Sequence, residues 1–310
     1  MVQPGASFVL LLISLLAGSG CGEPTAQEAQ PQPRPPPSVE TPSGTQEAAR
    51  IVAIGDLHGD LDATLAVLRL AGLVDEAGRW SGGHAVLVQT GDQLDRGDQG
   101  VETLDLLQRL QLEAAQAGGR VEVLLGNHEV MNLTGDWRYV TPGDIAGYGG
   151  QQARQAALAS EGEDGAWLRQ RPVSVKVGRT VFAHGGITPA MAEQGLDRLN
   201  AWALAAVRGL ASPEVLGREG PLWYRGYLEG DPLEVCPVLE RALASLGASR
   251  MVVGHTTQRS GRIAERCGGA LLGIDTGISA HYGQHIAALE IRGDDAWALY
   301  PSGMQDLVDP

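Results

Sequence analysis

Apolar residues along most of this chain occur in short continuous runs, separated by longer segments in which they recur at helical spacing. Aliphatic runs bounded by turn residues predict buried strands at residues 51–54, 85–89 and 121–125. The segments between them, 61–71 and 101–117, predict helices, so the pattern starts as β-α-β-α-β. The same pattern predicts further strands at 173–177, 181–183, 251–253, 271–274, 286–291 and 296–300, and helices at 199–208 and 234–246. We therefore expect a single α/β domain over residues 50–310.

The first 49 residues differ in composition from the rest of the chain. Residues 8–17 form an apolar run, shorter than the roughly 20 residues needed to span a bilayer, and small residues lead from it into Cys21. This predicts an export signal over residues 1–20, followed either by lipidation of Cys21 or by ordinary cleavage near Gly20. Residues 21–49 are rich in Pro, Gln, Glu and Thr and predict a disordered tether. The expected location is the periplasm or cell envelope, with membrane attachment if Cys21 is lipidated.

The composition limits the classes of partner. The 310 residues are 43% hydrophobic, which is enough for a substantial core. Acidic residues outnumber basic ones by 37 to 23, and Lys176 is the only lysine, so the formal net charge is −14. The sequence contains no basic stripe to neutralise nucleic-acid phosphates, and we expect no nucleic-acid partner. An acidic protein can still act on anionic substrates where metal ions and a few arginines supply positive charge.

Five of the expected strands end in motifs that contain Asp, His or Asn. In chain order the motifs are GDLHGD (55–60), GDQLDRG (91–97), GNHE (126–129), HGG (184–186) and GH (254–255). In open α/β sheets the loops beyond the carboxyl ends of the strands form the ligand crevice, so these side chains can converge. One such motif alone is more often a turn or a helix cap, but five in equivalent positions favour a metal site. The ligand types suit Mn²⁺, Fe²⁺ or Zn²⁺, and two ions that share one carboxylate would use them all.

This ordered set of motifs resembles that of the calcineurin-like metallophosphoesterases, within the phosphoprotein phosphatase superfamily. The segments PLWYRG (221–226) and VGHTT (253–257) resemble its bacterial-type branch, the Shewanella-like protein phosphatases. The residue before GNHE is Leu125, where the eukaryotic members usually have Arg, which also favours the bacterial type. The resemblance implies a metallophosphoesterase-like β-sandwich of mixed sheets flanked by helices, in a single catalytic domain.

The resemblance also implies a role for each motif residue. The expected ligands are Asp56 and His58 on a first divalent ion, Asn127, His184 and His255 on a second, and Asp92 as the bridge between the two. Mn²⁺ is the favoured metal, with Fe or Zn as alternatives, and a hydroxide held between the ions would be the nucleophile. His128 would be the general acid, oriented by Asp95. Arg96 and Arg225 would bind the phosphoryl oxygens.

The sequence leaves the substrate open. A phosphorylated protein is expected, with phosphotyrosine favoured over phosphoserine or phosphothreonine by the resemblance to the Shewanella-like branch. A small phosphoester is an alternative substrate. Two other functions also stay open: a nucleotide hydrolase of the diadenosine-tetraphosphatase type, and a lipoprotein that binds its ligand without catalysis.

Some residues outside the metal-ligand set have two interpretations. Cys236 and Cys267 could form a disulfide, as export to an oxidising compartment would allow, or remain free thiols. His281 could be a loop residue or lie at the rim of the pocket, and Asp275 could border the site or form a turn. Tyr139 could pack in the core or form a wall for the substrate.

Overall fold

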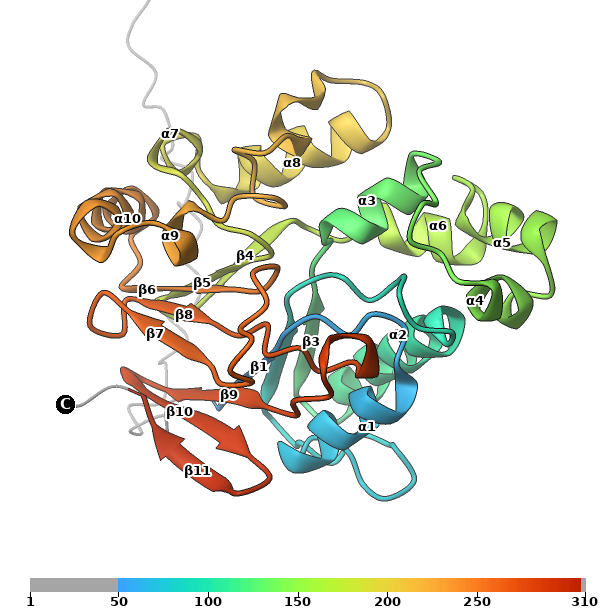
Figure 1. Ribbon diagram of the computed structural model, residues 1–310, viewed down its shortest axis with the longest axis horizontal. Helices are drawn as coiled ribbons and strands as arrows, with labels where there is room; N and C mark the ends of the chain where they lie inside the picture. The colour runs from blue at the N-terminus through green and yellow to red at the C-terminus, as the bar shows by residue number, and fades with distance from the viewer. Residues whose placement is uncertain (1–49, 308–310) are drawn as a thin grey trace, which may run out of the picture. The chain divides into compact units, whose positions relative to one another are not determined.

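A computed structural model describes residues 50–307 of the chain (Figure 1). The expected export signal, Cys21 and the tether of residues 21–49 lie outside the described residues. Among residues 50–307, no helix has both the length and the apolar character required to cross a membrane.

The first of two sheets contains the strands that begin the domain. Its six strands lie in the order β11-β10-β9-β1-β2-β3. In chain order they are β1 (Ile51–Ile54), β2 (Val86–Gln89), β3 (Arg120–Val123), β9 (Ala288–Arg292), β10 (Asp295–Tyr300) and β11 (Gly303–Asp306). The first three strands run parallel, because α1 (Leu61–Leu70) and α2 (Gly100–Gln116) form the crossovers between them. The last three strands pair antiparallel, so the sheet is mixed.

The second sheet carries the later motifs. Its five strands lie in the order β4-β5-β6-β8-β7. In chain order they are β4 (Ser174–Val177), β5 (Thr180–Ala183), β6 (Arg250–Val253), β7 (Ala264–Arg266) and β8 (Leu271–Gly273). The three central strands are parallel, and β4 and β7 pair antiparallel at the two edges. Both sheets are therefore mixed, as expected.

Helices flank the two sheets on both sides (Figure 1). Besides α1 and α2 they are α3 (Asn127–Leu133), α4 (Pro142–Gly147), α5 (Gln151–Leu158), α6 (Glu163–Leu168), α7 (Pro189–Ala192), α8 (Leu196–Val207), α9 (Gly226–Glu229) and α10 (Pro232–Leu246), with single 3-10 turns η1 (Pro213–Leu216) and η2 (Ala280–Tyr282). The four predicted helices are confirmed, with ends shifted by up to three residues. The pattern does not predict the shorter helices, because they span too few turns to show a helical period. It also does not predict strands β7 and β11, because neither contains a continuous aliphatic run.

Apolar layers join the sheets and helices into one domain. Phe182, Val252 and Leu289 belong to the core between the two sheets. Leu107 of α2 belongs to the layer under the first sheet, and Leu243 of α10 to the layer over the second. This helix-flanked sandwich confirms the fold class predicted from the sequence.

A disulfide links α10 to the turn that follows β7. It joins Cys236 and Cys267, whose Cα atoms are 5.5 Å apart. Of the two alternatives left by the sequence, the structure therefore contains the paired form.

Candidate metal centre

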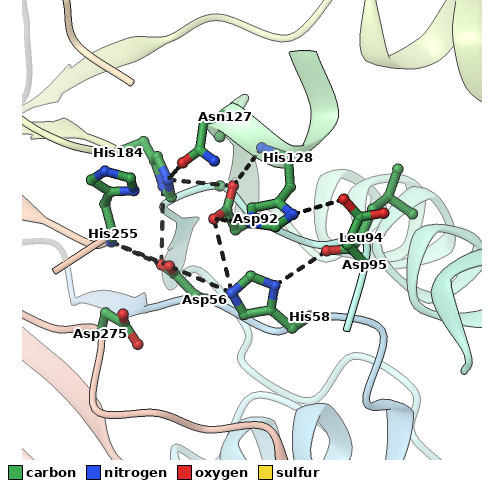
Figure 2. Close-up of polar contacts among 12 residues, drawn as sticks. Asp56, His58, Asp92, Leu94, Asp95, Asn127, His128, His184, His255 and Asp275 are labelled. Carbon is green, nitrogen blue, oxygen red and sulfur yellow. Dashed lines mark hydrogen bonds and ion pairs between the residues drawn. The ribbon is translucent and has the colours of Figure 1, made fainter. Parts of the chain in front are cut away.

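All six expected metal-ligand residues lie together at one edge of the sandwich (Figure 2). They belong to turns that follow β1, β2, β5 and β6, except Asn127, which is the first residue of α3 after β3. The parallel strands of each sheet end at the same edge, which is why residues far apart in sequence converge here. The residues are Asp56, His58, Asp92, Asn127, His184 and His255, and each is at most 5% exposed.

The backbone of these turns adopts conformations that side chains usually avoid. His58, Asp92 and His255 have positive φ values of 49°, 57° and 63°, in the left-handed region. Asp95 and Arg96 have φ values of 70° and 72°. Such conformations cost free energy and persist where the surrounding structure enforces them, often at functional sites.

Glu129 holds the turn after β2 in place. Its carboxylate is fully buried and accepts hydrogen bonds from the amides of Asp92 and Gln93, both at 2.8 Å, and of Leu94 at 3.0 Å. It also accepts from the amide of Gly126 at 2.8 Å, at the start of α3. One carboxylate thus ties the second motif to the third. Glu129 is not among the residues predicted for the site, although its place three residues after the N-cap Gly126 is a capping position.

The His58 imidazole faces two carboxylates. Its Nδ1 donates to the carbonyl oxygen of Leu94 at 3.2 Å, since a carbonyl can only accept. In the neutral ring the lone pair is then on Nε2, which lies 3.9 Å from Asp56 Oδ2 and 3.9 Å from Asp92 Oδ2. A backbone carbonyl that fixes the ring of a ligating histidine is a recurrent feature of metal sites.

The His184 ring presents its lone pair to other acceptors. Nδ1 donates to the carbonyl oxygen of Thr90 at 2.9 Å, which places the lone pair of the neutral ring on Nε2. Nε2 lies 3.0 Å from Asn127 Oδ1 and 3.3 Å from Asp92 Oδ1. With the ring neutral, three acceptor atoms face one another. A cation among them would turn this repulsive arrangement into a set of ligands.

The charge balance of the pocket also fits bound cations. Burial and the neighbouring carboxylates Asp275 and Asp92 raise the pKa of Asp56 well above its usual range. Burial lowers the pKa of His58 to about 3 and that of His255 to about 2, so both rings are neutral, the form that binds metals. His255 Nε2 is buried and has no hydrogen-bond partner among the described residues.

Geometry groups the donors into two sets that share one carboxylate. One set contains Asp92, His184 and His255, and the other contains Asp92, His58 and His128. A shared Asp92 is what a bridging carboxylate requires. The second set contains His128, which the sequence assigns to acid catalysis. Its Nε2 lies 3.8 Å from Asp92 Oδ2, so distance alone does not separate the two roles.

His128 forms a close pair with Asp95. Its Nδ1 lies 2.7 Å from Asp95 Oδ2, and the other carboxylate oxygen, Oδ1, accepts from Asn132 Nδ2 at 2.9 Å. Burial alone would lower the pKa of His128, but Asp92 and Asp95 outweigh it and raise the pKa above its ordinary value. The ring is therefore suited to carry a proton next to the metal ligands.

Both predicted arginines border the site. The Arg96 guanidinium lies 3.8 Å above the ring centroid of Tyr139, and its buried Nε has no hydrogen-bond partner among residues 50–307. Arg225 Nη1 donates to the carbonyl oxygen of His255 at 2.7 Å. Tyr139 also lies 5.1 Å from the His128 ring, so it belongs to the wall of the pocket.

Two residues with open interpretations also lie near the site. Asp275 accepts from the amide of Gly277 at 3.0 Å, as a turn residue does, and its charge acts on Asp56, so both interpretations apply. His281 is exposed and lines a cavity of about 410 Å³ together with Arg96 and Ser279. It is therefore a rim residue.

Comparisons with known proteins agree with this architecture. Residues 49–259 match the model of the calcineurin-like phosphoesterase family. An uncharacterized protein of Schizosaccharomyces pombe is 39% identical over 259 residues, which cover 79% of this chain and 78% of the relative. Shewanella-like protein phosphatase 2 of Arabidopsis thaliana is 33% identical over 312 residues, which cover 83% of this chain and 78% of the relative. The crystal structure of a cold-active protein-tyrosine phosphatase of a psychrophilic Shewanella species superposes with a TM-score of 0.74 at 29% identity, covering 84% of this chain and 80% of that one.

Proposed function

The chain belongs to the calcineurin-like phosphoesterase family, and from that premise we propose that it is a two-metal protein phosphatase that acts on phosphotyrosine. Family membership makes it a metal-dependent phosphoesterase. The observation that carries the two-metal assignment is the convergence of metal-ligand side chains on Asp92: His58 on one side, and His184 with Asn127 on the other. Two donor sets that share a carboxylate are the arrangement a pair of divalent cations uses.

The proposed roles of the side chains follow from their positions. Asp56 and His58 would hold one cation, Asn127, His184 and His255 the other, and Asp92 both. Bound cations, with Mn²⁺ as the proposed metal, would offset phosphoryl charge and supply an activated water nucleophile. Arg96 and Arg225 would bind phosphoryl oxygens through their planar donor groups.

The proton needed by the departing oxygen would come from His128. Asp95 accepts a hydrogen bond from His128 Nδ1. The other nitrogen of the ring, Nε2, therefore faces Asp92, where the phosphoester would bind. The carboxylate keeps the ring in the orientation and tautomer that a general acid requires. His128 would give its Nε2 proton to the leaving oxygen and regain one from solvent.

Aromatic residues around the pocket support an aryl phosphate as substrate. Tyr282 lies 4.8 Å from the His58 ring, Tyr139 lies 5.1 Å from His128, and Trp223 lies 5.5 Å from His255, as measured between ring centroids. All three are only half-buried, so a substrate ring could contact them. The similar Shewanella enzyme is described as a protein-tyrosine phosphatase, which supports the same choice.

We also propose that the protein is exported to the periplasm or cell envelope, with Cys21 as a lipid anchor. The composition of residues 1–49 and the disulfide between Cys236 and Cys267 support this location. Fractionation of cells that express wild type and Cys21→Ala tests the anchor. Equal amounts of the two proteins in the membrane fraction would argue against lipidation.

The proposed activity is tested on the purified full chain loaded with Mn²⁺. Initial rates are compared on a phosphotyrosine peptide, a phosphoserine peptide of the same sequence and diadenosine tetraphosphate. We expect the highest kcat/KM on the phosphotyrosine peptide and no activity after chelation. Preference for the phosphoserine peptide would overturn the tyrosine assignment alone. Hydrolysis of the dinucleotide alone would overturn the protein phosphatase assignment, and no hydrolysis by metal-loaded protein would favour a binding protein.

A further inference from the structure

Arg154 is a buried arginine outside the sequence motifs. It lies on α5, and its side chain is fully buried. Its Nε donates to Asp144 Oδ2 at 2.7 Å, and Asp144 Oδ1 accepts from the amide of Gly100 at 3.1 Å. Because a charge away from water needs an opposite charge beside it, Asp144 anchors the guanidinium.

A second carboxylate, that of Asp95, also lies next to the guanidinium. Arg154 Nη2 is 3.8 Å from Asp95 Oδ1. Within the described part of the chain, Nη1 and Nη2 have no hydrogen-bond partner. The guanidinium carbon lies 5.1 Å from the Trp137 ring and 5.4 Å from the Tyr148 ring. Aromatic faces attract a cation, so these rings help to keep the group beside Asp95.

Asp95 connects Arg154 to the reacting end of the site. Its two oxygens have separate partners. Oδ2 accepts from His128 Nδ1 at 2.7 Å, whereas Oδ1 accepts from Asn132 and lies beside Arg154. A cation held at one oxygen attracts the carboxylate and limits its rotation, which keeps the other oxygen on the His128 ring.

We propose that Arg154 is a positioning residue for the hydrolysis, acting through Asp95. Held by Asp144, the guanidinium fixes the Asp95 carboxylate, and the carboxylate directs the His128 ring at the leaving oxygen. Arg154 itself contacts neither the expected metal ligands nor the pocket. This inference rests on the proposed function, and in particular on His128 as the general acid.

The inference predicts a loss that depends on the leaving group. In the full chain loaded with Mn²⁺, Arg154→Met should lower kcat on phenyl phosphate by about 10- to 100-fold, a part of the roughly 10²–10⁴-fold that a general acid contributes. On p-nitrophenyl phosphate the loss should stay below about threefold, because that phenolate departs without protonation. Arg154→Lys keeps the charge and should recover part of the loss on phenyl phosphate.

Arg250→Met is the matched control for removal of a buried arginine. Arg250 is 7% exposed and donates to the carbonyl oxygens of Gly269 at 3.0 Å and Asp294 at 2.7 Å. It lies at the start of β6, at the opposite end of the strand from the GH motif of residues 254–255. Its replacement should lower stability and change kcat on the two aryl phosphates by the same factor.

Two further measurements cover the case in which Arg154→Met folds poorly. The double variant Arg154→Met with Asp144→Asn removes one charge of each sign, so that no unpaired carboxylate remains at position 144. In metal-free protein with ¹⁵N-labelled histidine, the Nδ1–H signal of His128 reports its hydrogen bond to Asp95 without any assay of activity. We expect this signal to shift or broaden in Arg154→Met and in the double variant, and to stay unchanged in Arg250→Met.

His128→Asn, measured in parallel, separates two kinds of failure. If its loss is equal on both aryl phosphates, the general-acid role fails, and this inference fails with it. The other failure is one in which His128→Asn shows the larger loss on phenyl phosphate, but Arg154→Met and the double variant do not, and the Nδ1–H signal of His128 is unchanged in both. Arg154 is then only structural, and this inference alone is overturned.

Discussion

Gly126 packs directly against Asp92. A Cβ atom on Gly126 would collide with the Asp92 carboxylate and with the Asp92 amide nitrogen. The amide of His128 donates to Asp92 Oδ1 at 3.0 Å, so the turn after β3 holds this carboxylate closely. Any side chain at position 126 would have to displace the one carboxylate that both donor sets share.

Gly126→Ala should therefore displace Asp92 and lower the metal content below that of wild type. Displacement of a reacting group by about 1 Å costs roughly 10²-fold in rate, so we expect a loss of that order on any phosphoester. Elemental analysis and a phosphatase assay measure both effects. The matched control is Gly147→Ala on α4, where the nearest contact of an added Cβ is 3.6 Å, to Val101. Wild-type metal content in Gly126→Ala would show that the turn tolerates the added atom.

Asp92→Asn should remove metal and activity together. Asparagine keeps the size of the side chain but removes the negative charge that both ions would share. We expect fewer than two metal ions per chain and a loss of at least about 10²-fold in kcat, since metal ions contribute several kcal/mol to phosphoryl transfer. Chelation of wild type should abolish activity, and Mn²⁺ should restore it. Two ions bound in Asp92→Asn would exclude the bridging assignment. Asp294→Asn, an exposed carboxylate, is the control.

The part of the site that could be predicted from sequence lies in local motifs. A glycine turn at the carboxyl end of a parallel strand places its Asp or His at one edge of the sheet, so the position of Asp56 or His184 follows from its own motif. The strands themselves are continuous aliphatic runs, and nine of the eleven are predicted close to their observed bounds. The two missed strands, β7 and β11, lie at sheet edges and contain no buried residue, so no apolar pattern marks them.

The supporting residues could not be predicted, because their roles depend on distant partners. Arg154 pairs with Asp144, ten residues away, and with Asp95, which is 59 residues away. Nothing near Arg154 in sequence marks a buried charge. Asn132 is closer to a motif, four residues after His128 on α3, but its contact with Asp95 requires the turn after β2 to lie beside that helix. Sequence patterns report local periodicity and turns, whereas these residues depend on how the turns pack.

Glu290 should make the stability of the fold depend on pH in the acidic range. Its carboxylate accepts from Arg50 Nη2 at 2.7 Å and from Arg292 Nε at 2.8 Å. Burial opposes ionisation, but the two guanidinium groups outweigh it and hold the pKa of Glu290 below its usual value. The stabilisation is therefore complete above the pKa of the unfolded chain and is lost as pH falls through the lower pKa of the folded state.

Glu290→Gln should lower the free energy of unfolding of the metal-free protein by about 1 kcal/mol at pH 7. The difference from wild type should shrink as pH falls through the folded-state pKa of Glu290, because the wild-type carboxylate is then protonated as well. Urea unfolding at several pH values measures it. Glu265→Gln, which replaces an exposed carboxylate on β7, should show little difference at any pH. A difference that persists at low pH would mean that packing, rather than charge, is lost.

His128→Asn should slow the hydrolysis of a phosphoserine peptide by about 10²–10⁴-fold, because a serine alkoxide leaves poorly without a proton. On p-nitrophenyl phosphate the loss should be much smaller, since the departing phenolate is stable on its own. The pair with Asp95 at 2.7 Å favours this role, whereas the 3.8 Å between His128 Nε2 and Asp92 Oδ2 would also suit a metal ligand. Metal content decides between the two roles, because loss of an acid leaves both ions bound and loss of a ligand does not. The experiment is kcat on both substrates with metal stoichiometry measured on the same preparation. Equal losses on the two substrates, or a missing ion, would move His128 from the acid to the ligand set.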